Sequence, residues 1–435
     1  MCGIVGFVDK EKHKEETIKK MMMRINHRGP DGEGTFIDED IALGHKRLSI
    51  IDLNTGNQPM FNENERYVII FNGEIYNYLE LKEELLKKDH YFKTTSDTEV
   101  LLHGYEEYGY NLLQRLRGMF AFVIWDREKK ELFGARDNFG IKPFYYYQNE
   151  NVFMFASEIK AFLDHPKFKK ELNKEILPLY LSFNYSPTED TFFKGVKKLE
   201  PGHFLVYKNG KLIIKRYFKL TFNEKEQPEA KAVEEIANIM KDSVKKHMLA
   251  DVEVGSFLSS GIDSSYLVAL ARPDKTYTVG YKISKYNEIS YAEDLAKKLN
   301  INNTSKIITK EEYFKVIPKI MYHMDEPLAD PAAVALYFVS KLASKDVKVV
   351  LSGEGADEFF GGYNYYREEV DYKFYNKIPF FIRHAISSVC KLLPEVRGIN
   401  FLVRRGQKLE DNYIGVNKVF SEKERKKIIN FKDKE

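Results

Sequence analysis

Apolar and polar positions change their spacing about halfway along this chain of 435 residues. In the first half, short apolar runs bounded by turn residues predict strands, and two stretches have helical spacing. The predicted strands are residues 4–8, 67–71, 119–125 and 131–135, the last two as a hairpin, and the predicted helices are 79–88 and 100–108. Strands and helices that segregate in this way predict an α+β sandwich.

In the second half, predicted strands and helices alternate. A polar stretch at 221–229 precedes an amphipathic helix at 234–248; strands are then predicted at 254–258, 276–281 and 347–351, and helices at 262–271 and 292–299. This alternation predicts an α/β domain with a parallel sheet, whose ligands bind at the carboxyl ends of the strands. We place the first domain at residues 1–205, a connecting segment at 206–230, and the second domain at 231–435.

Composition narrows the functional class. Lys plus Arg number 68 and Asp plus Glu number 65, so the net charge is only +3 and nothing suggests a nucleic-acid surface. The two cysteines, Cys2 and Cys390, do not make a disulfide framework and fit a reducing compartment. Charged residues at 9–12 interrupt any signal-peptide core, and no run of 18 apolar residues exists. We expect a cytoplasmic protein that binds neither nucleic acid nor membrane; its oligomeric state stays open, a homodimer included.

The first residues carry the first candidate for chemistry. If Met1 is removed, Cys2 presents both a thiol and a free α-amine. The amine titrates near ~7.7–8.0 and the thiol near ~8.5, so one residue supplies a nucleophile and its base. The predicted strand that follows would hold the thiol on a rigid element. A cysteine that merely follows Met is the plain alternative.

Further polar groups stand beside the predicted elements of the first half. They are the loop 27–32 (His-Arg-Gly-Pro-Asp-Gly), Arg47 before the apolar run 48–51, Asn72-Gly73-Glu74 after a core strand, and Ser96 to Glu99, which fit a capping box. Singly, each is better explained as a turn, a solvated arginine, a hairpin corner or a helix cap. Together with Cys2 they resemble the class II glutamine amidotransferases, which implies an N-terminal-nucleophile sandwich of αββα layers.

The resemblance implies a role for each of these residues. Cys2 would attack the glutamine side-chain amide, and Asn72 with the N–H of Gly73 would form the oxyanion hole. Arg47 would pair with the α-carboxylate, while Glu74 and Asp97 would accept from the α-ammonium. The wall of the glutamine pocket would be Leu48, Ser49, Ile50 and Ile51.

Two strand ends of the second half also carry candidate chemistry. The loop 259–265 (Ser-Ser-Gly-Ile-Asp-Ser-Ser) would open a helix with backbone N–H groups and hydroxyls, which suits phosphates. It resembles the Ser-Gly-Gly-x-Asp-Ser loop of enzymes that split ATP into AMP and pyrophosphate. The second loop, 351–358 (Leu-Ser-Gly-Glu-Gly-Ala-Asp-Glu), ends the next predicted strand. Asp263 and Asp357 would share Mg²⁺, whereas the plain alternative is two loops that only cap helices.

With these loops, and with residues 325–333 (Asp-Glu-Pro-Leu-Ala-Asp-Pro-Ala-Ala), the whole chain resembles the glutamine-hydrolysing asparagine synthetases. The implied substrates are glutamine, aspartate and ATP. Ammonia released at Cys2 would pass through an internal tunnel to an adenylated aspartate side chain, giving asparagine, AMP, pyrophosphate and glutamate. Glu354 would assist formation and capture of the intermediate. The implied ATP site comprises Leu258, Ser259, Ser260, Gly261, Asp263, Ser264, Val279, Ser352 and Gly353.

Two departures from the family pattern change what we expect. Ser260 stands where the family has glycine, and if that position needed positive φ the strain would be about 1–3 kcal/mol. Relatives also continue beyond the position of Glu435 with a helical region that includes a catalytic lysine. We therefore expect either a fragment or an incomplete synthetase half, with glutamine hydrolysis and little asparagine formation.

Two other functions stay open at this stage. An amidotransferase of the same architecture could use a different carboxylate acceptor, such as a wall or polysaccharide precursor. A non-catalytic scaffold or regulatory relative is the third alternative. The set Cys2, Arg47, Asn72 and Asp97 argues against it, whereas the missing C-terminal region argues for it in the second half.

Overall fold

The computed structural model describes residues 1–10, 12–283, 287–367, 372–394, 396–408, 419–420 and 422–429. The chain divides into two compact units. The first comprises Met1–Ile176 and Thr188–Ser352, and the second comprises Leu177–Pro187 and Gly353–Glu435. Each unit is described by itself.

Within the first unit, residues 1–176 and 188–216 form a sandwich of two six-stranded antiparallel sheets. One sheet has the order β10-β8-β9-β1-β3-β2 and the other β12-β11-β7-β6-β5-β4. Strands of the first sheet are β1 (Gly3–Val8), β2 (Gly32–Ile37), β3 (Ile41–Arg47), β8 (Tyr145–Asn149), β9 (Val152–Ala156) and β10 (Val196–Lys198). Strands of the second sheet are β4 (Met60–Phe61), β5 (Tyr67–Ile75), β6 (Gly118–Asp126), β7 (Glu131–Arg136), β11 (His203–Lys208) and β12 (Lys211–Arg216).

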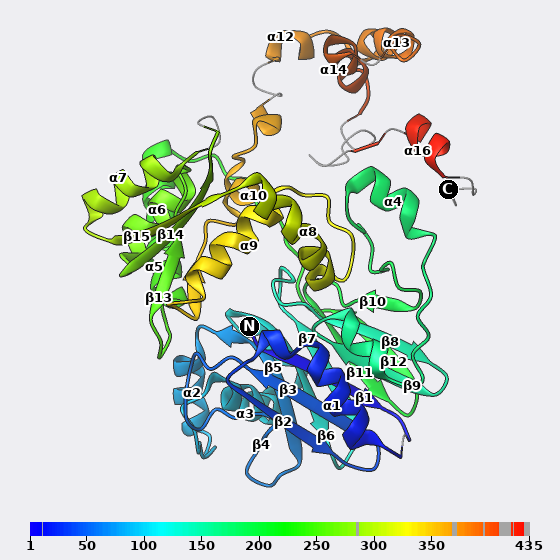
Figure 1. The fold of residues 1–435 in the computed structure, drawn as a ribbon, viewed down its shortest axis with the longest axis vertical. Coiled ribbons are helices and arrows are strands. Elements are labelled where there is room, and N and C mark those ends of the chain that lie inside the picture. Colours follow the sequence, from blue (N-terminus) through cyan, green and yellow to red (C-terminus); the bar gives the residue numbers. More distant parts are fainter. Residues whose placement is uncertain are drawn as a thin grey trace. The chain divides into compact units, whose positions relative to one another are not determined.

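Helices cover the outer faces of both sheets and complete four layers. The helices of this part are α1 (Lys14–Arg24), α2 (Tyr78–Leu86) and α3 (Asp97–Tyr108), with short 3₁₀ turns η1 (Asn26–Arg28), η2 (Gly109–Gln114) and η3 (Ile159–Asp164). Ile18 and Met22 of α1 pack on Phe7 of the first sheet, whereas α2 and α3 lie together on the second sheet (Figure 1). Between the sheets, Ile4 meets Val123 in a continuous apolar core. The predicted αββα sandwich is confirmed.

Strand β1 shows why its sequence is a continuous apolar run. Ile4 points into the core between the sheets, while Val5 and Phe7 point to the helix layer, and all three side chains are fully buried. A strand covered on both faces loses the alternation of apolar and polar residues.

The predicted hairpin is confirmed as β6 and β7, but the predicted end of β5 is wrong. Asn72 and Gly73 do not turn the chain; they lie inside β5, paired with Ala121 and Phe120 of β6. A Cβ on Gly73 would lie 2.3 Å from the carbonyl oxygen of Met119, so the glycine permits close approach of β6.

The predicted capping box at the start of α3 is only half formed. The Ser96 hydroxyl accepts from the N–H of Thr98, as an N-cap does. The Glu99 carboxylate instead accepts from the backbone N–H groups of Lys93 and Thr94, so the reciprocal bond is missing.

The remainder of the first unit is built on a four-stranded parallel sheet of order β15-β14-β13-β16. Its strands are β13 (Val254–Phe257), β14 (Lys275–Tyr281), β15 (Asn302–Ile308) and β16 (Val349–Leu351). The predicted parallel sheet is confirmed, but β15 escaped prediction. It is an edge strand with a polar, largely exposed run from Asn302 to Lys306, so it carries no apolar pattern.

Helices flank this sheet: α5 (Glu229–His247), α6 (Ile262–Ala271), α7 (Ile289–Leu299), α8 (Lys310–Met324) and α9 (Ala332–Ala343). Residues 217–228 have no regular structure and are mostly exposed, in agreement with the polar stretch seen in the sequence. Among the described helices of the whole chain, none combines the length and apolar character that a membrane crossing requires.

The second unit consists of short helices. They are most of α4 (Ile176–Phe183), then α10 (Ala356–Phe360), η5 (Asn364–Arg367), α12 (Lys373–Asn376), α13 (Phe380–Cys390), α14 (Arg397–Arg405) and α16 (Glu422–Ile428). Within it, α13 and α14 pack together, and the Ser387 hydroxyl donates to the carbonyl of Val403.

Candidate active site

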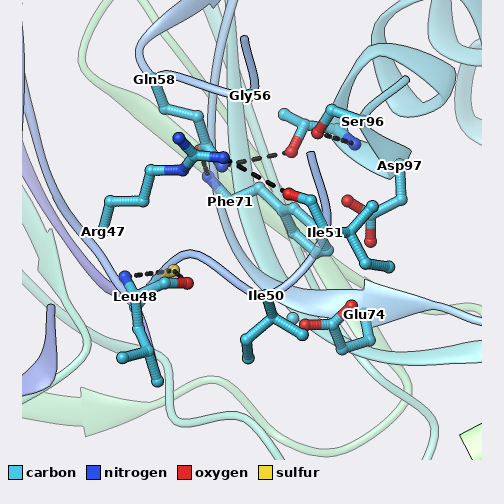
Figure 2. Close-up of a pocket in the computed structure, with 13 residues that line it drawn as sticks. Arg47, Leu48, Ile50, Ile51, Gly56, Gln58, Phe71, Glu74, Ser96 and Asp97 are labelled. Atoms are coloured by element: carbon cyan, nitrogen blue, oxygen red, sulfur yellow. Dashed lines mark hydrogen bonds between the residues drawn. The ribbon is translucent and has the colours of Figure 1, made fainter. Parts of the chain in front are cut away.

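Cys2 lies at the start of β1, with its thiol beside the loop that follows β3. The sulfur is 3.4 Å from the backbone nitrogen of Leu48 and 3.6 Å from its carbonyl oxygen (Figure 2). Arg28, from the His-Arg-Gly-Pro-Asp loop, donates from Nε to the carbonyl of Cys2 at 2.9 Å. Two segments distant in sequence therefore fix the backbone and the thiol of the same residue.

The thiol opens into a pocket that is partly open to solvent. The structure brings most of the predicted glutamine-site residues to this pocket. Its lining residues are Cys2, Arg47, Leu48, Ile50, Ile51, Gly56, Gln58, Phe71, Gly73, Glu74, Ser96, Asp97 and Thr98. Five of these were not predicted: Gly56, Gln58, Phe71, Ser96 and Thr98.

Two carboxylates, the buried Asp97 and the half-buried Glu74, share one side of the pocket (Figure 2). Burial and the neighbouring charge of Asp97 raise the pKa of Glu74 well above its ordinary value. Burial also raises the pKa of Asp97 to about 6, although the N–H of Ile75 donates to its Oδ2 at 3.0 Å and opposes the rise. Two neighbouring carboxylates with raised pKa values favour a bound cation, because a positive charge between them stabilises their ionised forms.

Arg47, which is only 6% exposed, places its guanidinium on the other side of the pocket (Figure 2). Nη1 donates to Asn57 Oδ1 at 3.1 Å, and Nη2 donates to the carbonyls of Ile51 and Asp52. A Cβ on Gly56 would lie 2.5 Å from Nη2, so glycine is needed where the loop passes the guanidinium. The loop 51–57 thus orients Arg47, and Arg47 in turn holds the loop.

Asn72 and Ser49 belong to the predicted set but do not line the pocket. Asn72 is 1% exposed, and its side-chain Nδ2 has no hydrogen-bond partner among the described residues. A buried amide donor left unpaired costs about 1–3 kcal/mol, so it calls for a partner in the working protein. Ser49 is buried and acts through its backbone, donating to Asp31 Oδ2 at 2.9 Å.

The chain's N-terminus is itself part of this environment. Burial lowers the pKa of the Met1 α-amine to about 5, and burial raises the pKa of the Cys2 thiol. Lys142 lies beside Met1, with Nζ 3.3 Å from its sulfur, and burial lowers the pKa of this lysine. An amine in such a place stays neutral at physiological pH, whereas the thiol needs a base.

The predicted phosphate loop follows β13 and opens α6. Gly261 caps the helix, the Ser259 and Ser264 hydroxyls are 2.9 Å apart, and the N–H of Gly261 donates to the Ser259 hydroxyl. Ser260 is not among the residues with positive φ, so the strain anticipated for a serine there is absent. Its N–H donates to Glu288 Oε2 at 3.2 Å.

Strands β13 and β16 are parallel neighbours, with Ser256 paired to Leu351, so Leu258 and Ser352 begin loops at the same edge of the sheet. Leu258 is buried, Val279 is half-buried on β14, and Asp263 is exposed in the first turn of α6. The remaining predicted residues, Gly353, Glu354 and Asp357, belong to the second unit, the last of them on α10.

Family comparisons agree with this geometry. The family model described as "Glutamine amidotransferase domain" matches residues 1–218, and "Asparagine synthase" matches residues 218–418. The chain is similar to asparagine synthetase [glutamine-hydrolyzing] 1 of Bacillus subtilis (strain 168), with 47% identity over 440 residues, 99% of this chain and 70% of that protein. The chain belongs to the glutamine-hydrolysing asparagine synthetases.

Other asparagine synthetases match as well. Asparagine synthetase [glutamine-hydrolyzing] 3 of the same Bacillus strain is 34% identical over 392 residues, 84% of this chain and 64% of that protein. Among solved structures, a glutamine phosphoribosylpyrophosphate amidotransferase from B. subtilis covers 70% of this chain and 65% of its own, with a TM-score of 0.39 and 19% identity. The predicted family, its ligase class and its fold are confirmed; the domain bounds and the roles of single residues stay predictions.

In this asparagine synthetase the pocket beside Cys2 is tied to the parallel-sheet part of the chain. Asp251, just before β13, accepts from the N–H of Asp52 at 2.8 Å and donates its own N–H to the carbonyl of Ile50. Lys348, just before β16, contacts Asp31 Oδ2 at 2.6 Å. Burial alone would raise the pKa of Asp31, but the hydrogen bonds from Lys348 and Ser49 keep this pKa below its ordinary value.

The Asp325-Glu326 pair of the family motif makes a second connection. Asp325 accepts from the N–H of Ile159 at 2.7 Å and pairs with Lys160 at 3.0 Å, while Glu326 accepts from the N–H of Phe192 at 2.9 Å. Lys160 also pairs with Glu158, which binds Arg28 at 2.9 Å.

This chain of buried charges leads back to Cys2. Burial alone would raise the pKa of Glu158. The hydrogen bond from His27 and the charges of Arg28 and Lys160 outweigh burial and hold this pKa at about 2. Arg28 then holds the carbonyl of Cys2. Sequence inspection noticed Arg28 and Asp325 as motif residues, but nothing in the sequence showed that they belong to one network.

Proposed function

We propose that this chain releases ammonia from glutamine at Cys2 and uses it to convert ATP-activated aspartate to asparagine. The observation that supports the first half most directly is the charge pattern of one pocket. A thiol, a guanidinium and a pair of carboxylates line the same pocket. Free glutamine carries an α-carboxylate and an α-ammonium at one end and a reactive amide at the other, which matches these three groups.

Cys2, freed of Met1, attacks the glutamine side-chain carbonyl. Because burial raises the pKa of the thiol, it requires a base, and its own α-amine is that base. The α-amine of Met1 shows the effect of burial at this end of the chain, because burial lowers its pKa to about 5. The tetrahedral oxyanion then accepts hydrogen bonds from Asn72 Nδ2, the orphaned donor beside the pocket, and from the N–H of Gly73.

Glutamine is positioned by its charged end. Glu74 and Asp97 accept hydrogen bonds from the α-ammonium, which lowers the cost of holding two carboxylates together in a buried site. Arg47 pairs with the α-carboxylate from the loop that Gly56 allows to pass close by. Leu48, Ile50 and Ile51 line the pocket around the ligand.

The second half activates the acceptor. The loop after β13 offers hydroxyls and backbone N–H groups at the start of a ten-residue helix, which suits the phosphates of ATP. Leu258, Val279, Ser352 and Gly353 border the nucleotide, and Glu354 assists formation and capture of the intermediate. Asp263, an exposed carboxylate in the first helical turn, has the oxygen donor that Mg²⁺ prefers, and Asp357 is its proposed co-ligand.

The remaining parts of the proposal concern the whole molecule. Residues 1–205 form the glutaminase, 206–230 connect, and 231–435 contain the ATP site. Two cysteines in so long a chain suit work in the cytoplasm, and a homodimer is the proposed assembly.

The test separates the two half-reactions. With Cys2→Ala, we expect no glutamate from glutamine and unchanged asparagine formation from aspartate, ATP and ammonium, because only ammonia release uses the thiol. Cys390→Ala, which removes the other cysteine, is the matched control and should keep both activities. Full glutamine hydrolysis by Cys2→Ala would refute the nucleophile. Consumption of ATP and ammonium with a different carboxylate, but not with aspartate, would refute the acceptor.

A further inference from the structure

Outside the glutamine pocket, four side chains of the sandwich converge at one place. They are Glu63 from the turn between β4 and β5, His90 from the loop after α2, and His103 and Glu106 from α3. One ligand atom from each lies within 4.8 Å of the others. Neither the glutaminase chemistry nor the synthetase chemistry uses any of these residues.

His103 makes this more than a chance gathering of charges. The side chain is 1% exposed, and neither ring nitrogen has a hydrogen-bond partner among the described residues. Nδ1 lies 3.4 Å from Glu63 Oε2, and Nε2 lies 3.6 Å from Glu99 Oε1, in both cases without hydrogen-bond geometry. A buried imidazole that no hydrogen bond of good geometry satisfies is open to a further partner, such as a metal ion.

The distances suit a metal ion. Ligand atoms about 2.0–2.2 Å from a tetrahedral Zn²⁺ lie about 3.3–3.6 Å from one another. The 3.4 Å between Glu63 Oε2 and His103 Nδ1 is one such edge. The rings of His90 and His103 are 5.1 Å apart, and the two glutamates are exposed and can adjust.

Groups around the cluster already orient its members. The N–H of Tyr91 donates to Glu63 Oε1 and Asn62 Nδ2 donates to Glu106 Oε2, each at 3.1 Å. Glu99, held by two backbone N–H groups, faces His103 Nε2. A carboxylate behind a histidine, and hydrogen bonds on the second oxygen of each carboxylate, are the usual surroundings of metal ligands.

We propose that Glu63, His90, His103 and Glu106 form a structural site for a divalent transition metal of the Zn²⁺ class. Two imidazoles and two carboxylates from the protein fill a four-coordinate shell, which is typical of a structural rather than a catalytic ion. The ion joins α3 to the β4–β5 turn and to the loop before α3. Since α3 starts at Asp97, the ion lies about 9 Å along the helix from the glutamine pocket at about 1.5 Å per residue.

Metal binding to the full-length chain is the test, with Zn²⁺ as the probe and no affinity tag. After dialysis against a chelator, calorimetric titration should show one Zn²⁺ per chain, and Co²⁺ in its place should give a visible absorption spectrum of tetrahedral coordination. Zn²⁺ should also raise the unfolding temperature.

Variants assign the ligands. His90→Asn and Glu106→Gln remove the more accessible ligands, so both should fold, and each should weaken Zn²⁺ binding by at least about 100-fold. His103→Asn should do the same if it folds. His13→Asn, at an exposed histidine before α1, is the matched control and should bind as the parent does. Cys2→Ala should also keep binding, because the thiol is not part of the site.

Three results would overturn the proposal. They are no saturable Zn²⁺ binding to the parent chain, equal binding by His90→Asn and the parent, or binding that disappears in Cys2→Ala. The first would indicate that Glu63 and Glu99 are the only polar partners of His103.

Discussion

Replacing Asp97 with asparagine should stabilise the protein while weakening its use of glutamine. The carboxylate is fully buried against the N–H of Ile75, beside the carboxylate of Glu74, and its pKa is raised to about 6. Asparagine keeps the shape and an oxygen that can accept the same hydrogen bond. It removes only the charge, which is the feature proposed to bind the α-ammonium.

The expected magnitude follows from the pKa. The ordinary value is 3.8, so the folded protein holds this proton more tightly than the unfolded chain does. Stability from this group is therefore greatest below pH 3.8 and is lost as pH rises through about 6. At about 1.4 kcal/mol per pKa unit, the ionised Asp97 destabilises the free protein by up to about 3 kcal/mol at pH 8, and asparagine should recover part of this.

The cost to function comes from a lost charge-assisted hydrogen bond. Such a bond contributes about 1.5–3 kcal/mol, which corresponds to about a 10- to 150-fold loss in kcat/KM for glutamine. Asparagine formation from free ammonium should be unaffected, because it bypasses the pocket.

Trp125 allows the predicted change in stability to be measured. It is the chain's single tryptophan and lies buried between the two sheets, so its fluorescence during urea titration follows the sandwich itself. Asp97→Asn should be more resistant to urea than the parent at pH 8, and the difference should shrink at pH 5. Glutamate release measured over a range of glutamine concentrations provides the kinetic half.

Asp52→Asn is the matched control, with the opposite sign. Although burial would raise it, hydrogen bonds from Thr55 and Thr95 lower the pKa of Asp52 to about 2. The stability that ionised Asp52 contributes to the protein is present above pH 3.8 and is lost as pH falls through about 2. Asp52→Asn should therefore lower the free energy of unfolding by about 2 kcal/mol at pH 8. If Asp97→Asn were the less stable variant at pH 8, or bound glutamine normally, the charge argument would be wrong.

Three further predictions concern the loop around Arg47. Arg47→Lys keeps the charge but loses the planar fork, so the glutamine KM should rise by about tenfold or more in steady-state assays; an unchanged KM would remove Arg47 from the site. Gly56→Ala places a methyl 2.5 Å from Arg47 Nη2, so it should raise the glutamine KM with normal ammonium-dependent activity, unless the loop moves freely. Asp251→Ala removes the acceptor of the Asp52 N–H, worth about 1.5–3 kcal/mol, and should impair glutamine use more than ammonium use; equal loss of both would place Asp251 in general stability instead.

Local pattern was sufficient where an element's burial follows its sequence spacing. The β6–β7 hairpin, α6 and β13 lie where apolar periodicity and turn residues put them. Prediction from the local pattern failed where hydrogen bonding between strands overrides the local preference of the residues. Asn72-Gly73 has the composition of a turn, but β6 supplies hydrogen-bond partners on through Ile75, so the strand continues. Strand β15 is polar because it is an exposed edge, and only its neighbour β14 makes it a strand.

The sequence by itself determined the family and pointed to the residues proposed for the chemistry, because a thiol at position 2, Arg47 and Asp97 have few other reasons to occur together. Only the tertiary structure decided how they work as a unit. It brought Asp97 against Glu74, closed Gly56 on Arg47, and tied the pocket loop to Asp251, a residue about 200 positions away in the chain. Such contacts depend on distance and burial in space, and linear spacing does not encode them.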